Sequence, residues 1–189
     1  PVASGRISVT QAWAFVVACS LAGLVILLSL SPLAVALGLG SLVLVAAYPF
    51  MKRFTWWPQA WLGLTFNWGV LMGYAAATGG SVLAGAWSWF VDGFVVFEPG
   101  RISLAAALLY ASGVFWTLGY DTIYAIQDLE DDALAGVKSS ARRLGAKARG
   151  GVAGFYVMAI ALAFLAGWMA GLNVLFGVAL FAGIFMIFG

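Results

Sequence analysis

Six apolar windows, separated by short polar or proline-containing breaks, take up most of this chain of 189 residues. A helix needs roughly 20 apolar residues to cross about 30 Å of hydrocarbon, and these windows have about that length. Charged residues make up 8% of the chain, whereas a soluble domain usually has about a quarter. The pattern therefore predicts an all-α fold, a polytopic bundle of transmembrane helices in a lipid bilayer.

The windows predict six spans in this chain. They run from Val9 to Leu30, Pro32 to Tyr48, Pro58 to Thr78, Ile102 to Ala125, Gly151 to Ala170, and Leu172 to Gly189. The segment between the third and fourth spans, Gly79 to Arg101, has aromatic residues flanked by two acids. These are Trp87, Trp89, Phe90, Phe94 and Phe97, with Asp92 and Glu98. The pattern suits a short helix or hairpin at the bilayer surface, or a re-entrant piece over the bundle.

Lysine and arginine orient the bundle, because they concentrate in loops on the cytoplasmic side. With six spans, eight of the nine positive residues fall on one side, and only Arg101 lies opposite. The eight are Arg6, Lys52, Arg53, Lys138, Arg142, Arg143, Lys147 and Arg149. The net charge of +2 is too small to indicate a nucleic-acid partner.

The acidic residues are strongly clustered. Five of the seven fall within one dozen positions: Asp121, Asp128, Glu130, Asp131 and Asp132. If the fourth span continues as a helix past Ala125, then one face carries Asp121, Tyr124, Asp128, Asp131 and Asp132. Like charges at i and i+4 destabilise a helix by a few tenths of a kcal/mol, so this spacing suggests a compensating cation.

A divalent cation such as Mg²⁺ fits this pattern, because it binds through one or two carboxylates, water and substrate phosphates. The chain has no histidine and one cysteine, Cys19, so carboxylates are the main candidates for metal ligands. Lys138, Arg142 and Arg143 follow the acids and could contact a phosphate. The alternative is a solvated interfacial helix with ordinary local ion pairs.

Two further groups of residues could line a site. Tyr48 and Lys52 lie one helical turn apart and Arg53 follows, so a phenol and cations could face an anion, or could simply form an aromatic belt with a positive anchor. Asn67 lies in the middle of the third span. A carboxamide at that depth is expected to hydrogen-bond to a neighbouring helix or to line a pocket.

Three stretches of the chain resemble one known family. "YDTIYAIQDLEDDALAGVKSSARRLG" resembles the second aspartate-rich motif of the UbiA-type intramembrane prenyltransferases, most closely their 4-hydroxybenzoate polyprenyltransferase branch. "YPFMKRFTWWPQAWLGLTFNWGVLMGYAA" is similar to the YxxxK element and the following helix, and "PVASGRIS" to the tail after the first aspartate-rich motif.

This resemblance implies a bundle of eight or nine helices in which two aspartate-rich motifs hold Mg²⁺ and the diphosphate of a polyprenyl donor. Diphosphate would leave, and the carbocation would alkylate 4-hydroxybenzoate, a small aromatic acceptor, ortho to the phenol in ubiquinone biosynthesis. The metal-diphosphate pair would be Asp128 and Asp132, with Asp121 and Asp131 as supporting acids. Tyr48 and Lys52 would be the catalytic YxxxK pair and Lys138 a diphosphate contact. We expect Arg53, Asn67 and Tyr124 to bind substrate.

The first aspartate-rich motif is expected to precede "PVASG". We therefore expect residues 1–189 to be a single prenyltransferase domain truncated at both ends and inactive alone. The implied location is a bacterial inner membrane, or alternatively a mitochondrial inner membrane, with the active-site loops on the cytoplasmic or matrix side. No obligate protein partner is inferred. The alternatives are a sister enzyme for homogentisate, a naphthoate, a chlorophyllide or haem, and, remotely, a transporter, whose charges should lie near the bilayer midplane.

Overall fold

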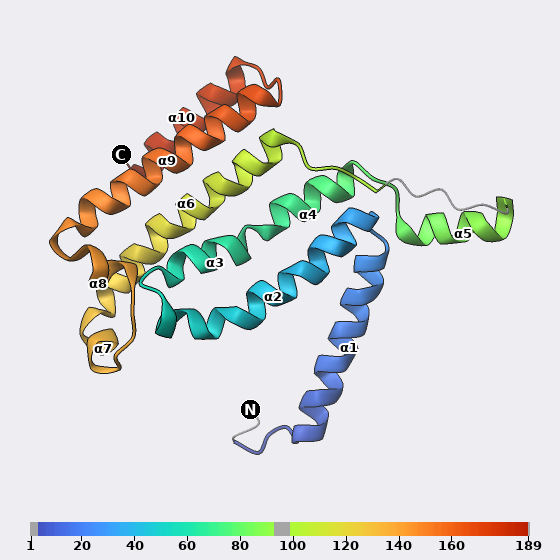
Figure 1. Ribbon diagram of the computed structural model, residues 1–189, viewed down its shortest axis with the longest axis horizontal. Helices are drawn as coiled ribbons and strands as arrows, with labels where there is room; N and C mark the ends of the chain where they lie inside the picture. The colour runs from blue at the N-terminus through green and yellow to red at the C-terminus, as the bar shows by residue number, and fades with distance from the viewer. Residues whose placement is uncertain (1–3, 93–98, 189) are drawn as a thin grey trace. The chain divides into compact units, whose positions relative to one another are not determined.

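The computed structural model describes residues 4–92 and 99–188, and helices joined by short connections make up these ranges (Figure 1). The chain divides into two compact units. The first unit comprises Pro1–Gly38 and Ala75–Arg101, and the second comprises Leu39–Tyr74 and Ile102–Gly189. Two helices, α2 (Pro32–Phe54) and α4 (Trp68–Ala77), run from one unit into the other.

Helix α1 (Val9–Leu28) of the first unit begins with a reciprocal cap. The Ser8 hydroxyl accepts a hydrogen bond of 3.1 Å from the backbone N–H of Gln11, and the Gln11 side chain accepts one of 3.0 Å from the N–H of Ser8. These bonds satisfy donors that the first helical turn cannot pair internally. Helix α5 (Val82–Asp92) confirms a helix in the aromatic segment, whereas Phe94, Phe97 and Glu98 lie outside the described residues.

Three connections of the first unit meet around Ser31. The buried hydroxyl of Ser31 donates to the carbonyl of Ala75 at 2.8 Å. The N–H of Leu33 donates to Pro99 and that of Val82 to Leu30, both at 2.9 Å. Gly100 passes so close that a Cβ there would lie 2.5 Å from the Ala75 carbonyl oxygen, and its φ is +80°. Only glycine adopts this backbone conformation without strain.

The core of the second unit is α6 (Leu104–Gln127), which packs against α3 (Pro58–Phe66) and α9 (Ala148–Met169) (Figure 1). Small side chains permit the close approach of α6 and α9. Buried small residues include Ala106, Ser112 and Gly119 on α6, and Ala159, Ala163 and Ala166 on α9. Gly63 of α3 lies directly against the backbone of Val114. Close packing through small residues is typical of membrane helix pairs.

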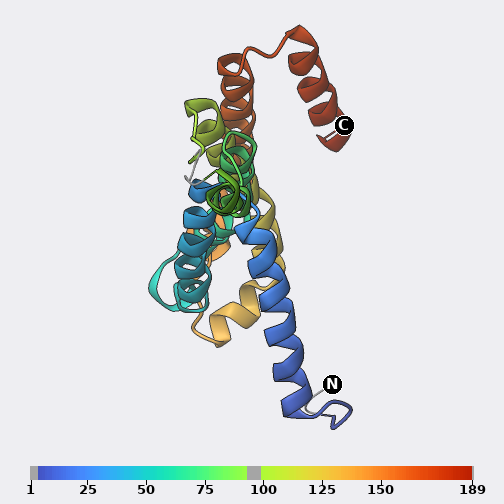
Figure 2. The same ribbon diagram turned by 90° about the vertical axis from the view of Figure 1, so that its right-hand side faces the viewer.

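Helix α9 turns back into α10 (Val174–Phe188), and Figure 2 shows the two as a hairpin in orange and red. Gly171 adopts a φ of +72° in the connection. The N–H of Leu172 then donates to the carbonyl of Gly167 at 3.0 Å, which pairs one of the carbonyls left open at the end of α9. The break between the fifth and sixth predicted spans, at Gly171, is therefore a turn.

The predicted spans all correspond to helices, and three of them change by more than two residues or are divided. Helix α2 continues to Phe54, the third window is divided into α3 and α4 at Asn67, and α9 begins at Ala148. Within the described residues, four segments are long and apolar enough to cross a membrane: Val9–Leu28, Pro32–Phe54, Pro58–Ser88 and Ser140–Met169. Helix α6, with 24 residues, is not among these four segments. Of α10, the described part has 15 residues.

The prediction of one continuous helix from Asp121 to Asp132 is wrong. Helix α6 ends at Gln127, Asp128 is the junction, and α7 (Leu129–Leu134) follows. Carboxylates are unfavourable near the negative end of a helix dipole and favourable in the first turn of a helix. The break gives Asp131, Asp132 and Glu130 the favourable place, because all three now lie in the first turn of α7.

Candidate functional site

Two of the predicted motifs meet in the second unit. Tyr48 and Lys52 belong to α2, and Asp121 belongs to the last two turns of α6. The Asp121 carboxylate lies within electrostatic range of both the Lys52 ammonium and the Tyr48 phenol. The partly buried acid in the last two turns of α6 and the cation at the end of α2 therefore lie in the same part of the second unit.

A direct backbone contact also joins Lys138, which follows the acidic turn (residues 128–132), to the end of α2. The N–H of Lys138 donates to the carbonyl of Lys52 at 3.0 Å. The Lys138 ammonium donates to the carbonyl of Phe54 at 3.4 Å. Lys52 and Arg53 occupy the last turn of α2, where positive charge is favourable, and both are exposed. The structure thus places four of the predicted residues, Tyr48, Lys52, Asp121 and Lys138, at one end of the second unit.

A buried polar junction fixes this arrangement, and the sequence reasoning missed it. The side-chain oxygen of Gln59, at the start of α3, accepts from the N–H of Ser140 at 3.1 Å. The hydroxyls of Thr122 in α6 and Ser140 lie 2.7 Å apart in a hydrogen bond. Ser140 begins α8 (Ser140–Leu144). The signal was available, since polar residues at the edges of apolar spans normally need a partner.

The acidic turn itself is open to solvent. Asp128 and Asp131 are exposed and Asp132 is partly buried. The N–H of Asp132 donates to the carbonyl of Asp128 at 2.8 Å, so these two residues lie one helical turn apart. Across residues 4–92 and 99–188, no three acidic or cysteine side chains gather into a group that could hold a metal ion. This part of the chain therefore supplies a pair of carboxylates and not a complete cage.

Arg142 and Trp56 both support the acidic turn. The guanidinium of Arg142 donates to the carbonyl of Val137 and, at 3.3 Å, to that of Asp132. Trp56 lies in the connection between α2 and α3, with the Lys138 ammonium 5.8 Å and the Arg142 guanidinium 5.6 Å from its ring centre. These contacts tie α8, the acidic turn and the end of α2 together.

Asn67 has both of the roles that its position suggested. Its amide donates to Gly63 within α3 and to the hydroxyl of Thr117 in α6, each at 2.9 Å. A Cβ on Gly113 would collide with its carboxamide oxygen, so the absent side chain of Gly113 makes room for it. Asn67 also lines an apolar cavity of about 450 Å³ between α4, α6, α9 and α10.

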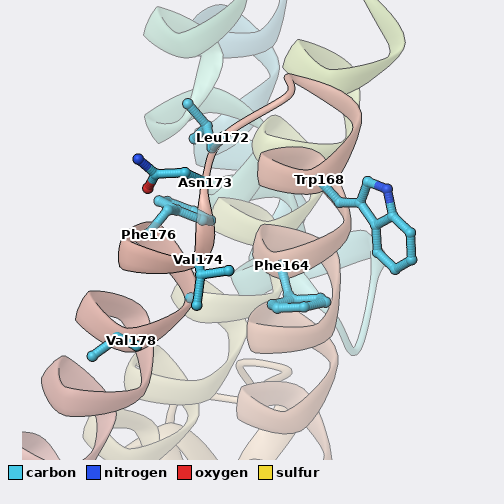
Figure 3. Close-up of a pocket in the computed structure, with 8 residues that line it drawn as sticks. Phe164, Trp168, Leu172, Asn173, Val174, Phe176 and Val178 are labelled. Carbon is cyan, nitrogen blue, oxygen red and sulfur yellow. The ribbon is translucent and has the colours of Figure 1, made fainter.

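The cavities lie away from the acids. A second one of about 440 Å³ shares Val70, Leu109 and Ala163 with the first. A third of about 510 Å³ lies at the turn between α9 and α10, where Figure 3 shows Phe164 and Trp168 from α9 and Phe176 from α10. Thr117 and Val114 share the α6 face of Asp121, which α3 covers. On α6 the first cavity is lined by Leu109, Ser112, Gly113 and Trp116, and none of the three cavities is lined by an acidic residue.

The remaining predicted residue, Tyr124, is exposed. Its ring meets that of Tyr120 edge-on, with centres 6.5 Å apart. Of the predicted site residues, only Asn67 lines any of the three cavities. The site in these ranges is thus an open polar end of a helix bundle.

Comparison with known proteins agrees with these motifs. A model of the UbiA prenyltransferase family matches residues 1–189. This chain belongs to the UbiA prenyltransferase family. Among the solved structures, the apo structure of a UbiA homolog from Aeropyrum pernix K1 matches with a TM-score of 0.67 and 30% identity, over 95% of this chain and 61% of that one. The expected all-α transmembrane fold of the UbiA family is confirmed, and the chain is a membrane protein.

Curated members of the UbiA family are more similar in sequence. The chain is 44% identical over 174 residues to the mitochondrial 4-hydroxybenzoate polyprenyltransferase of Arabidopsis thaliana, which covers 92% of this chain and 38% of that protein. It is 42% identical over 171 residues to the protein of the same name from Homo sapiens, over 90% of this chain and 41% of that one. The chain thus spans about two fifths of the length of these relatives.

Proposed function

We propose that the protein containing this chain transfers a polyprenyl group from polyprenyl diphosphate to the ring of 4-hydroxybenzoate, ortho to the phenol, in ubiquinone biosynthesis. The observation that carries the proposal is the meeting of Asp121 with Tyr48 and Lys52, and of Lys138 with the end of α2. Acids and bases suited to a metal-bound diphosphate converge there. The names of the curated relatives support the substrate pair.

Asp128 and Asp132 fit a shared divalent cation, for which we propose Mg²⁺. They lie one turn apart on the solvent-facing acidic turn. Mg²⁺ usually takes one or two carboxylates and completes its shell with water and phosphate oxygens, so a pair is sufficient on the protein side. We assign supporting roles to Asp121 and Asp131. Bound there, the ion would neutralise charge that develops on the leaving diphosphate.

The side chains of this chain would contribute binding and electrostatics. Lys138 and Lys52 present ammonium groups at the same end of the second unit, where they would stabilise diphosphate as the carbon–oxygen bond breaks. Tyr48 would orient Lys52 and the substrate. We propose Arg53 as a contact for diphosphate or for the acceptor carboxylate, and Asn67 and Tyr124 as substrate contacts. The three cavities are not assigned to the prenyl tail, because none of them is lined by Asp121, Asp128 or Asp132.

We further propose that residues 1–189 belong to a single prenyltransferase domain whose polar end faces the cytoplasm or matrix. The curated relatives are named as mitochondrial, which favours the mitochondrial alternative over the bacterial membrane that the sequence analysis put first. A sister enzyme would differ from this proposal in the aromatic acceptor that it prenylates. A transporter is disfavoured because the acids lie at the ends of helices.

The test is a transfer assay with the complete protein in liposomes, labelled prenyl diphosphate, and 4-hydroxybenzoate, homogentisate or a naphthoate as acceptor. Prenylated 4-hydroxybenzoate is the expected product. If only another acceptor is prenylated, that compound would replace 4-hydroxybenzoate as the proposed acceptor. The double variant Asp128→Asn, Asp132→Asn should lose metal-dependent diphosphate release, and unchanged release would remove the pair from the metal site.

A further inference from the structure

Trp56 occupies a position that the reaction scheme does not use. It lies in the three-residue connection between α2 and α3, after the YxxxK pair, and is 37% exposed. Its ring lies near two cations from the segment that follows the acidic turn: Lys138 at 5.8 Å and Arg142 at 5.6 Å from the ring centre. Both separations are within the range of a cation–π interaction.

The two cations reach different parts of the site. Lys138 makes two hydrogen bonds to the end of α2. Its backbone N–H donates to the carbonyl of Lys52, and its ammonium donates to the carbonyl of Phe54. Arg142 is bonded to the acidic turn through the carbonyl of Asp132. Like charges repel each other, and the attraction of each cation to the Trp56 ring offsets part of that repulsion. The indole therefore links the carboxylate pair to the YxxxK helix through two side chains.

We propose that Trp56 is a positioning residue of the diphosphate site: it holds Lys138 and Arg142 in place so that the basic segment and the acidic turn are arranged before the prenyl diphosphate binds. The inference rests on the proposed function for its catalytic meaning, but the contacts themselves are independent of it. Trp57, the next residue, provides a matched comparison, because its ring meets Phe155 edge-on, with centres 6.0 Å apart.

The experiment compares Trp56→Leu, Trp56→Phe and Trp57→Leu in the complete protein. Leucine keeps apolar bulk and removes the π face, whereas phenylalanine keeps a weaker one. Trp56→Leu should raise the KM for prenyl diphosphate about fivefold with a smaller change in kcat. Trp56→Phe should recover part of that loss. Trp57→Leu should leave the KM unchanged even if it lowers the melting temperature.

Limited trypsin digestion in detergent provides a readout that does not depend on activity. Trp56→Leu should speed cleavage after Lys138 and Arg142, and Trp57→Leu should not. An unchanged KM and an unchanged cleavage rate in Trp56→Leu would overturn the inference, as would faster cleavage with an unchanged KM, because the contact would then not serve the site. If the wild-type protein transfers no prenyl group but the Trp56→Leu variant is still cleaved faster, the proposed function would be overturned. The structural contact of Trp56 with Lys138 and Arg142 would stand.

Discussion

The backbone N–H of Lys138 donates a hydrogen bond of 3.0 Å to the backbone carbonyl of Lys52. The two predicted motifs, 86 positions apart along the chain, are thus joined through the main chain. The side chain of Lys52 takes no part in this bond, so a substitution of Lys52 should separate chemistry from stability.

Lys52→Met tests that separation. The variant removes an exposed ammonium and keeps the backbone contact, so the free energy of unfolding should change by less than about 0.5 kcal/mol. Turnover should fall by at least about tenfold, because a cation for the leaving diphosphate is lost. Steady-state kinetics and thermal unfolding of the complete protein measure the two effects. Lys147→Met removes another exposed lysine and should alter neither; equal activity in both variants would contradict the role of Lys52.

The buried hydroxyl pair of Thr122 and Ser140 should show strong coupling. Thr122→Val leaves the Ser140 hydroxyl without its partner 2.7 Å away, and this should cost about 1–3 kcal/mol of unfolding free energy. Thr122→Val combined with Ser140→Ala should cost less than the sum of the single changes, because both polar groups are gone. A double-mutant cycle from chemical unfolding in detergent measures the difference. Strict additivity would show that the two hydroxyls do not interact.

Gly113→Ala should disturb Asn67. The new methyl would occupy the space of the Asn67 carboxamide, so the side chain must leave its bond to Thr117 or the helices must separate, at about 1–3 kcal/mol. Gly69→Ala is the matched control, because a Cβ there meets no atom within 4 Å. That change should be neutral or slightly stabilising. Melting temperatures of the two variants should therefore move differently, and an unchanged value for Gly113→Ala would contradict the packing.

Gly100→Ala should destabilise the first unit. Its φ of +80° is unfavourable for alanine, and the new Cβ would lie 2.5 Å from the Ala75 carbonyl oxygen. Gly136 has a φ of +66° but open space around it, so Gly136→Ala incurs the backbone strain alone. We expect the Gly100 variant to lose at least about 1 kcal/mol more than the Gly136 variant. Thermal unfolding of both proteins provides the comparison, and equal losses would exclude the steric contribution.

Much of the fold follows from hydropathy, and the departures have local causes. The window ending at Tyr48 underestimates α2 because Lys52 and Arg53 are polar, yet positive charge suits a helix C-terminus. Asn67 divides the third span, where its carboxamide is bonded to α6. The break at Asp128 was missed because periodicity alone carries no information about the helix dipole.

The charged residues of the candidate site could be predicted from the sequence, but the residues that support them could not. Asp128, Asp132, Lys52 and Lys138 are conspicuous in an apolar chain. Gln59 and Ser140 are not, because their importance comes from a hydrogen bond between distant segments. Trp56 is one of nine tryptophans, and only the three-dimensional contacts distinguish it.

The bond between Gln59 and Ser140 spans 81 positions of the chain, and this has a consequence for the order of folding. During synthesis Gln59 emerges long before Ser140, and all of α6 must enter the membrane between them. Helices α2 and α3 can form locally at once. The polar end can form only after the long chain segment between Gln59 and Ser140 has brought these two residues together. We therefore expect the site to be among the last parts of the second unit to mature, after the apolar helices beside it have already associated.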